Sequence, residues 1–386
     1  MRKNKLRLLF AFASVTLLVA CSSKGTSSST STEEITDLVG RKISVNTSSL
    51  SKVVCIGAGA LRLYTYINGS SLLSGVEDID NPSKNSDLNK QFASSPRPYY
   101  MVYGDSLKEL PSVGKGGPSN QAAEKELIAS CSPDLVISEY EDVEAANELQ
   151  NAIGIPVAVV KYDSKNIFGD TIYSSLRLIG KLVGKKERAE ELITYMESSV
   201  KEVNDLTKDV KDEDKKSVYL GCLGSWGVQD IFMTSSSYPL FNIGNIKNAA
   251  SSLLTGAGFQ TIDQEAFFTL NPDIIILDAS GIGKFKTTYN GSLKASFDSL
   301  NAFKNGNLYL QMPYNNYFTN IETALMDLYY DASVAFPGLF ASLDIEKKSN
   351  EITKKFLGKE IYAEMSSLPN SYGGFQKIDV STFLKA

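Results

Sequence analysis

The sequence has 386 residues, 42% of them hydrophobic, which is enough apolar material for two globular cores once an N-terminal signal is set aside. A formal net charge of -5 without a long Lys/Arg block excludes nucleic acid as the main partner, because phosphate binding needs concentrated positive charge. The sequence contains no histidine, which weighs against His-ligated zinc or haem and against Ser-His-Asp or Cys-His chemistry.

The first twenty residues have the form of an export signal. A basic stretch is followed by an apolar run that is shorter than the roughly 20 residues a membrane-spanning helix needs. The run ends in Leu-Val-Ala-Cys at residues 18–21, which resembles the lipobox of bacterial lipoproteins. The resemblance implies a signal peptide over residues 1–20 and a lipid on Cys21; an ordinary cleaved signal with a chance cysteine is the alternative. A polar Ser/Thr-rich stretch follows, so we expect a tether over residues 21–35.

The other three cysteines, Cys55, Cys131 and Cys222, lie in or beside apolar runs and far apart in the sequence. An odd number cannot pair completely within one molecule, and the wide spacing does not resemble a metal-binding cluster. We expect them to be buried and unpaired.

Strand patterns alternate with helical ones over residues 36–165. Residues 37–45 have the alternation and the glycine of a small hairpin. Apolar runs that predict strands and periodic segments that predict helices follow, the strands at residues 52–56, 73–76, 135–138 and 157–160, and the helices at residues 121–130 and 143–153. This order predicts an α/β lobe with a mostly parallel sheet.

Residues 166–210 repeat apolar residues at helical spacing without a proline, so they predict a linker of one long helix, or of two helices joined at Gly184. A second α/β lobe is expected over residues 211–386. Its signals are strands at residues 217–222 and 308–310 and helices at residues 321–335 and 345–357.

A short pattern occurs in both halves. Glu126 precedes Pro133-Asp134 and an aliphatic run, and Glu265 precedes Pro272-Asp273 and a similar run at the same spacing. The local interpretation is a helix that ends, a Pro-Asp turn and a strand that enters the sheet. Pro-Asp before a strand is common, but its recurrence with a glutamate at equal spacing indicates that one half repeats the other.

The order of these features resembles the class III substrate-binding proteins, which carry iron-siderophores, haem and cobalamin to ABC importers. Beyond the lipobox and the paired motif, the resemblance includes residues 37–43, 54–63, 75–78, 110–114, 154–157 and 180–189. It implies two α/β lobes with mostly parallel sheets, joined by a long α-helix, and modest closure of the lobes on a ligand held between them. It also implies a monomeric, lipid-anchored binding protein on the outer face of the cell membrane, with no catalytic residues and no resident cofactor or metal.

The implied partners are an ABC permease with its ATPase and a small metal chelate. In that family one surface glutamate of each lobe pairs with arginines of the permease, and the matching residues here are Glu126 and Glu265. Solvated glutamates without a partner are the alternative, and Glu124 and Asp263 are neighbours that could substitute for them.

We expect ligand-binding residues in the loops that follow strands, near the carboxyl ends of the sheets. Glycines let the backbone approach a ligand closely, although they also occur in tight turns. Arg62 either binds the ligand or is a surface charge. Aromatic rings suit a large flat ligand, because they can stack on its faces. The candidates are Gly57, Gly59, Arg62, Arg97, Tyr99, Tyr100, Tyr103, Trp226, Tyr238, Tyr314 and Tyr317. Residues 139–141, just after a strand, are further candidates.

The leading functional hypothesis is capture of an iron(III)-siderophore or related metal chelate. Haem and corrinoids are rivals within the same fold, and haem would use Tyr or Met of residues 97–103 if it is ligated. A surface enzyme or an adhesin is the alternative from a different class. The enzyme hypothesis lacks a Gly-x-Ser-x-Gly elbow, a cysteine cluster and a phosphate loop.

Overall fold

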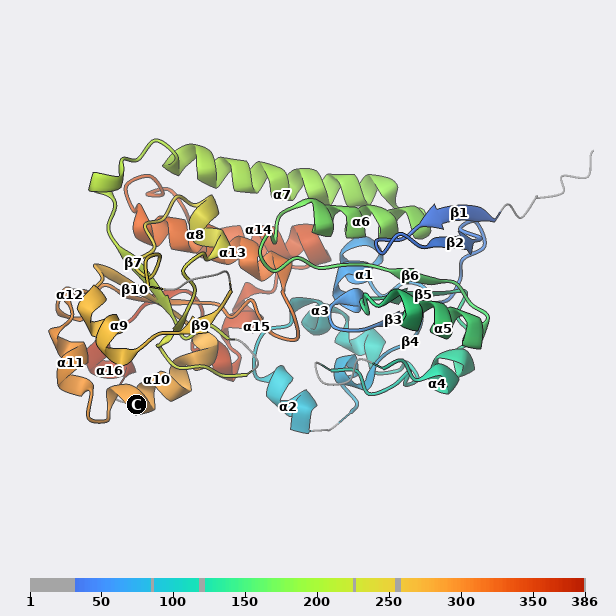
Figure 1. Cartoon of the computed structure of the whole chain (residues 1–386), viewed down its shortest axis with the longest axis horizontal. Helices are drawn as coiled ribbons and strands as arrows, with labels where there is room; N and C mark the ends of the chain where they lie inside the picture. The colour runs from blue at the N-terminus through green and yellow to red at the C-terminus, as the bar shows by residue number, and fades with distance from the viewer. Residues whose placement is uncertain (1–31, 85–86, 118–121, 225–226, 254–257, 385–386) are drawn as a thin grey trace, which may run out of the picture.

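The computed structural model describes residues 32–84, 87–117, 122–224, 227–253 and 258–384. Two of the expected functional residues, Cys21 and Trp226, lie outside this part of the chain. Two α/β lobes lie next to each other, and a long helix runs along one side of both (Figure 1).

The N-terminal lobe is built on a four-stranded sheet in the order β4-β3-β5-β6, with every neighbouring pair parallel. The strands are β3 (Val53–Ile56), β4 (Leu73–Gly75), β5 (Leu135–Ser138) and β6 (Val157–Val159). All four residues of β3 and of β5 are buried, as expected for central strands that are covered on both faces. The helical elements are α1 (Ala60–Asn68), η1 (Asp78–Asp80), α2 (Asp87–Ala93), α3 (Pro98–Leu107), α4 (Lys125–Ser130) and α5 (Val143–Ile153).

Two local expectations for this lobe need correction. Residues 97–103 are not a loop, because Pro98 occupies the first turn of α3, a position where its missing N–H is not needed. The hairpin consists of β1 (Glu33–Thr36) and β2 (Lys42–Val45), so its first strand lies partly within the range expected to be tether. An ion pair between Lys181 and Glu33 holds the first strand against the linker.

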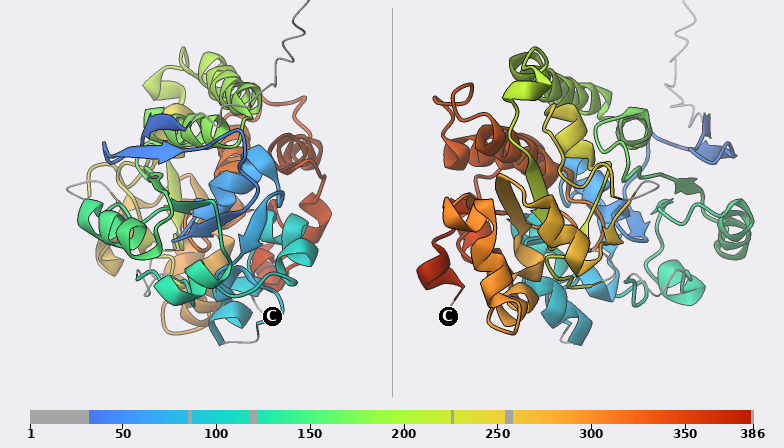
Figure 2. Two further views of the ribbon diagram at one scale, coloured as in Figure 1. Left: turned by 90° about the vertical axis from the view of Figure 1, so that its right-hand side faces the viewer. Right: turned by 60° about the vertical axis from the view of Figure 1, so that its left-hand side comes forward.

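The linker consists of two helices rather than one. Helix α6 (Asp170–Leu182) ends before Gly184, whose φ of 69° is left-handed, and α7 (Lys186–Thr207) continues for 22 residues. A Cβ on Gly180 would lie 2.9 Å from the Cβ of Ala189, so this glycine permits close packing of α6 on α7. Seen along the long axis, both linker helices lie on the same side of the lobes (Figure 2, left).

The C-terminal lobe has a second four-stranded sheet in the order β12-β11-β10-β7, in which only β12 is antiparallel to its neighbour. Its strands are β7 (Val218–Gly221), β10 (Ile274–Asp278), β11 (Leu308–Gln311) and β12 (Gln376–Lys377). A separate antiparallel pair is formed by β8 (Met233–Thr234) and β9 (Gln260–Thr261). The helices are α8 (Pro239–Ile243), α9 (Gln264–Leu270), α10 (Ile282–Tyr289), α11 (Lys294–Ser299), α12 (Asn301–Lys304), α13 (Ile321–Ala335), α14 (Ile345–Leu357), α15 (Tyr362–Ser366) and α16 (Val380–Phe383). Short 3₁₀ turns are η2 (Asp212–Asp214), η3 (Ala279–Gly281) and η4 (Pro369–Ser371).

The junction between the lobes is part of the hydrophobic core. One continuous cluster of buried apolar residues includes the first strand of each sheet, the linker helices and α13. Fourteen of the 15 residues of α13 are buried, so this helix of the C-terminal lobe is covered on nearly all sides. A junction of this kind resists wide separation of the lobes because separation would expose apolar surface to water.

Candidate functional site

The carboxyl ends of the parallel strands in the two lobes face each other across the junction. Tyr162 lies three residues beyond the end of β6. Its ring meets that of Phe318, in the loop after β11, with the ring centroids 4.7 Å apart and the planes nearly perpendicular. Tyr162 is half-buried, and Phe318 has 38% of its surface exposed. Loops at the carboxyl ends of sheets are the usual place for ligands in open α/β sheets. We call this surface, formed by Glu139, Tyr140, Tyr162 and Phe318, the strand-end face.

Gly57 and Gly59 support aromatic rings of the strand-end face instead of leaving space for a ligand. Both glycines have left-handed φ values, 88° and 96°. A Cβ on Gly57 would lie 3.1 Å from the ring of Tyr140, and one on Gly59 would lie 2.5 Å from the ring of Tyr162. The Tyr162 hydroxyl also donates to the Gly59 carbonyl at 3.1 Å. The glycines therefore position the two tyrosines, and the rings cover the backbone.

Arg62 is neither a surface charge nor an exposed clamp, because it is fully buried and joins the two lobes. Its Nε donates to Oδ1 of Asn320 at 3.0 Å. Its Nη2 donates to the carbonyl of Tyr317 at 2.6 Å and to that of Asn316 at 3.2 Å. The guanidinium also lies over the ring of Tyr99, 4.8 Å from its centroid. In this structure Arg62 is bonded to the loop between β11 and α13 rather than free to bind a ligand.

The same loop is held by the N-terminal lobe in a second way. The side-chain amide of Asn316 donates to the carbonyls of Phe92, Ser95 and Pro96. Tyr317 and Phe318 have φ values of 50° and 70°, a left-handed conformation that is costly for bulky residues and persists only where the surroundings enforce it. The strained turn places the Phe318 ring outward on the strand-end face.

A buried carboxyl group lies beneath this face. Glu77 is 5% exposed, and its oxygens accept hydrogen bonds from the Gly57 N–H and from the hydroxyls of Tyr317 and Tyr140. Burial, reinforced by Asp80, raises the pKa of Glu77 to about 8, although those hydrogen bonds act in the opposite direction.

Glu139 brings a second carboxyl group to the strand-end face, where it is half-buried. Burial, followed by the charges of Glu141 and Glu77, raises the pKa of Glu139 to about 8. Both carboxyl groups can therefore gain or lose a proton close to neutral pH.

The candidates on α3 do not converge on one surface. Tyr99 is fully buried, and its hydroxyl donates to Oδ1 of Asp80 at 2.6 Å. Tyr100 and Tyr103 are half-buried and line two different pockets, with volumes of about 300 and 340 Å³. Arg97 is 1% exposed and donates to Asp80 at 3.0 Å. The expected cluster of three tyrosines and an arginine is therefore dispersed by the helix.

Tyr238 and Tyr314 lie in the core of the C-terminal lobe, not on the strand-end face. They are 0% and 2% exposed, and their ring centroids are 6.3 Å apart. Tyr317 is also buried, at 3% exposed, with its hydroxyl accepting from the Gly117 N–H at 3.1 Å. The partly exposed rings are instead those of Phe318 and Tyr162, which the sequence analysis did not select. Their positions in loops that follow strands were the available signal.

The repeated motif forms the same structure in both lobes. Oδ2 of Asp134 accepts hydrogen bonds from the backbone N–H and the hydroxyl of Ser51, both at 2.8 Å, just before β3. Oδ2 of Asp273 accepts from the N–H and the hydroxyl of Ser217 at 2.9 and 2.8 Å, just before β7. In each lobe the Pro-Asp turn therefore ties the start of one strand to the start of its parallel neighbour.

Glu126 and Glu265 are the second residues of α4 and α9, and both are exposed. Neither carboxylate has a hydrogen-bond or ion-pair partner within the described ranges. Their neighbours are engaged: Oε1 of Glu124 accepts from the Lys115 N–H at 3.0 Å, and Asp263 caps α9. Of the four acidic residues considered, the two in the motif are the ones with carboxylates available to a partner.

The three cysteines of the folded part are buried and free, as expected. Within the described residues, no group of three or more His, Cys, Asp or Glu side chains is placed to hold a metal ion. In the same part of the chain, no helix is both long and apolar enough to cross a membrane.

Comparison with known proteins identifies the family. A family model described as a periplasmic binding protein matches residues 87–313, which is more than half of the chain. The chain belongs to the periplasmic binding protein family. The expected resemblance to substrate-binding proteins of ABC importers is thereby confirmed, and the family is one of binding proteins rather than enzymes.

Relatives of this periplasmic binding protein agree with its two-lobed fold. A periplasmic solute-binding protein from Veillonella parvula DSM 2008 superposes with a TM-score of 0.66 at 20% identity, covering 92% of this chain and 98% of that one. The molybdate-bound MolA of Haemophilus influenzae superposes with a TM-score of 0.62 at 17% identity, covering 85% and 98%.

In sequence, the chain is 26% identical over 170 residues to the uncharacterized ABC transporter substrate-binding lipoprotein YvrC of Bacillus subtilis (strain 168). This match covers 44% of this chain and spans about half, 52%, of the length of that relative.

Proposed function

We propose that this periplasmic binding protein is the extracytoplasmic receptor of an ABC importer and that it captures an iron(III)-siderophore or a related metal chelate. The observation that carries the proposal is the strand-end face, where Tyr162 and Phe318 from different lobes meet with their rings partly exposed. Small displacements of the lobes would open space between these rings for a ligand, without the loss of the whole apolar junction.

The chemistry of the strand-end face suits a ligand with flat, partly apolar outer surfaces. Tyr140, Tyr162 and Phe318 offer ring faces and edges for stacking, while the two tyrosine hydroxyls donate within the protein, to Glu77 and to the Gly59 carbonyl. Glu139 adds a carboxyl group at the edge of the same face. The organic shell of a chelate presents such surfaces, and the metal inside it would need no ligand from the protein.

The geometry gives haem less support. Haem ligation would use a Tyr or Met of residues 97–103, but Tyr99 is bonded to Asp80 in the interior. Met101 and Tyr103 line two different pockets, and neither pocket is lined by Tyr162 or Phe318. A corrinoid would meet the same rings as a siderophore and is distinguished from it by experiment.

The ligand class is tested by incubating the purified chain, produced from residue 22 onward, with iron(III)-siderophores, haem and cobalamin separately. Native mass spectrometry and the absorption spectrum then report which ligand remains bound after desalting. We expect one equivalent of an iron(III) chelate with its charge-transfer absorption. Retention of a sugar or a peptide from a mixed panel, with no chelate bound, would contradict the proposal.

For the membrane side of the function, we propose a lipid on Cys21 and docking of the permease through Glu126 and Glu265. Two exposed carboxylates on separate lobes fix one orientation of the receptor, and Arg–carboxylate pairs supply directional contacts. Charge reversal of both residues, Glu126→Lys and Glu265→Lys, is expected to abolish uptake and leave ligand affinity unchanged. Glu144→Lys, an exposed substitution on α5, is the matched control. Loss of ligand affinity in the double variant, or normal uptake, would refute the docking role.

A further inference from the structure

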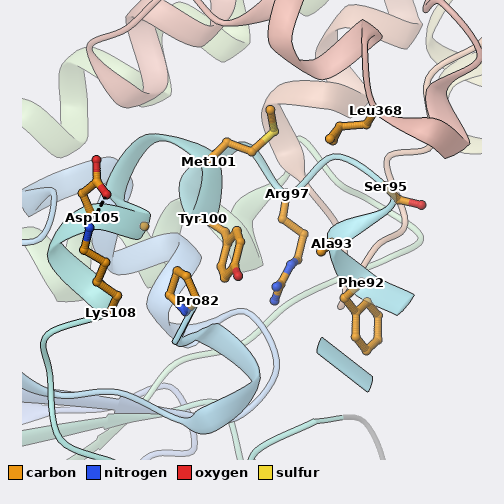
Figure 3. A pocket seen from close by; sticks show the side chains of 11 residues that line it. Pro82, Phe92, Ala93, Ser95, Arg97, Tyr100, Met101, Asp105, Lys108 and Leu368 are labelled. Carbon is orange, nitrogen blue, oxygen red and sulfur yellow. Dashed lines mark hydrogen bonds and ion pairs between the residues drawn. The ribbon is translucent and has the colours of Figure 1, made fainter. Parts of the chain in front are cut away.

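A pocket of about 300 Å³ lies beside α2 and α3 (Figure 3). Its apolar walls come from five residues, of which the last belongs to the C-terminal lobe: Pro82, Phe92, Ala93, Met101 and Leu368. The residues of the strand-end face are not among those that line it. The pocket is therefore a separate space at the lobe junction.

Arg97 gives this pocket a buried positive charge with one free edge. The side chain is 1% exposed, and its Nη1 donates to the Ile79 carbonyl and to Oδ1 of Asp80, both at 3.0 Å. Its Nε and Nη2 have no hydrogen-bond partner among the residues that the structure describes. Buried donors without partners are rare and costly, so each calls for an explanation.

Aromatic rings fix the orientation of that edge. The guanidinium lies 4.1 Å from the ring centroid of Tyr100 and 5.7 Å from that of Phe92. Figure 3 shows the Arg97 side chain between the rings of Tyr100 and Phe92, two of the residues that line the pocket with it. A guanidinium held flat by rings loses little further freedom when its Nε and Nη2 atoms bind an acceptor.

We propose that this pocket binds a small organic monocarboxylate with a compact apolar body. The Nε and Nη2 donors form the parallel fork that a carboxylate accepts in bidentate fashion. The apolar walls would cover the body, and a volume of about 300 Å³ suits a ring or a short aliphatic chain.

The charges around the pocket argue for a single negative charge on the ligand. The other edge of Arg97 already faces Asp80. Lys108, which also lines the pocket, is paired with Asp105 at 2.8 Å. A second negative charge would therefore find no free cation among the described lining residues.

Binding of a ligand in this pocket would also stabilise the junction between the lobes. The segment that forms one wall is held by the C-terminal lobe: the Asn370 N–H donates to the Ser94 carbonyl at 2.9 Å, and its side chain donates to Ser95 Oγ at 3.1 Å. A ligand that orders this wall stabilises the joined form of the lobes, because it binds the folded arrangement and not the unfolded chain.

The proposal is tested by ¹⁹F NMR titration of the full mature chain with 4-fluorobenzoate, using 4-fluorobenzyl alcohol as the uncharged probe of similar shape. We expect one saturable site for the carboxylate, at least tenfold weaker binding of the alcohol, and a rise in Tm with the carboxylate. No saturable binding of the carboxylate, or equal binding of both probes, would overturn the proposal.

Substitutions locate the site. Ala93→Trp, at an exposed position of the wall, is expected to fill the pocket and abolish binding, and Arg97→Lys is expected to weaken it at least tenfold. Arg177→Lys, in an exposed ion pair on α6, should bind as the unsubstituted chain does. If Arg97→Lys fails to fold, Ala93→Trp decides alone, and unchanged affinity in a folded Ala93→Trp variant would show that the carboxylate binds elsewhere.

Discussion

In the N-terminal lobe, α4 leads through Pro133-Asp134 into β5, and in the C-terminal lobe α9 leads through Pro272-Asp273 into β10. Each aspartate accepts the same pair of hydrogen bonds from a serine that precedes the neighbouring strand. The loops at the opposite ends of the strands are not alike. After β3 the chain turns at two glycines covered by tyrosine rings, whereas after β11 it forms the strained turn of Tyr317 and Phe318.

This difference separates two tasks. The ends of the lobes that carry the repeated Glu-to-Pro-Asp motif have equivalent structures, as a partner that contacts both lobes would require. The glutamates of the motif are exposed there. The strand ends differ between the lobes, because the loops there must fit the two lobes against each other. Buried polar contacts such as those of Arg62 hold the two lobes together. Removing one of them is expected to cost more free energy of unfolding than removing an exposed contact of the motif.

The largest effect is expected from breaking the junction at Arg62. Arg62→Ala leaves the carbonyls of Asn316 and Tyr317 and the side chain of Asn320 without their donors, at a cost of about 3–5 kcal/mol in the free energy of unfolding. Urea unfolding followed by circular dichroism measures the loss. Arg177→Ala, which breaks an exposed ion pair, should change the free energy by less than about 1 kcal/mol. Similar small values for both variants would show that the junction is not held by Arg62.

The next largest effect is a pH dependence of the free energy of unfolding, caused by Glu77 beneath the strand-end face. The pKa of Glu77 is raised to about 8 in the folded chain, so between its ordinary value and that pH the unfolded state binds fewer protons than the folded state. The stability that Glu77 contributes is therefore complete at low pH and lost as the pH rises through about 8. Glu77→Gln should remove a downward slope in the free energy of unfolding of up to about 1.4 kcal/mol per pH unit over that window.

Urea unfolding at a series of pH values between 5 and 8.5 measures this slope. Glu144→Gln, an exposed substitution on α5, is the control and should leave the slope unchanged. A Glu77→Gln variant with the slope of the unsubstituted chain would show that Glu77 is not protonated preferentially in the folded state.

In the repeated motif we expect smaller losses of stability, equal in the two lobes. Asp134→Ala and Asp273→Ala each remove hydrogen bonds to a serine at the start of the adjacent strand, and each should cost about 1 kcal/mol. Although partial burial acts in the opposite direction, the hydrogen bonds from Ser51 and Lys52 keep the pKa of Asp134 below its ordinary value. Chemical denaturation compares the two variants. A difference of several kcal/mol between them would contradict the structural equivalence of the two motifs.

The sequence predicted those elements whose signals are local. The bounds of β5, α5, α13 and α14 coincide with the predicted segments, since hydrophobic periodicity and capping residues lie within each segment. The Pro-Asp motif was informative for the same reason. The extent of α3 was missed because Pro98 was read as part of a loop rather than as the first residue of a helix.

The residues at and beneath the strand-end face were predicted less well, because their burial depends on partners that are distant in the sequence. Arg62 contacts residues more than 250 positions away, and no local pattern distinguishes such an arginine from an exposed one. Tyr238 and Tyr314 follow or precede strands in the sequence as a ligand-facing residue would, yet their rings turn into the core. Which side chain fills the junction is decided by the packing of the two lobes together.

The central claim, that a metal chelate binds between the lobes at the strand-end face, is tested most directly by calorimetric titration of an iron(III)-siderophore into three proteins. These are the unsubstituted chain, Phe318→Ala, and Leu339→Ala as a control of similar exposure, 43% against 38%. We predict that Phe318→Ala weakens binding at least tenfold because a stacking surface is lost, and that Leu339→Ala binds normally. Equal affinity of Phe318→Ala and the unsubstituted chain would contradict the account.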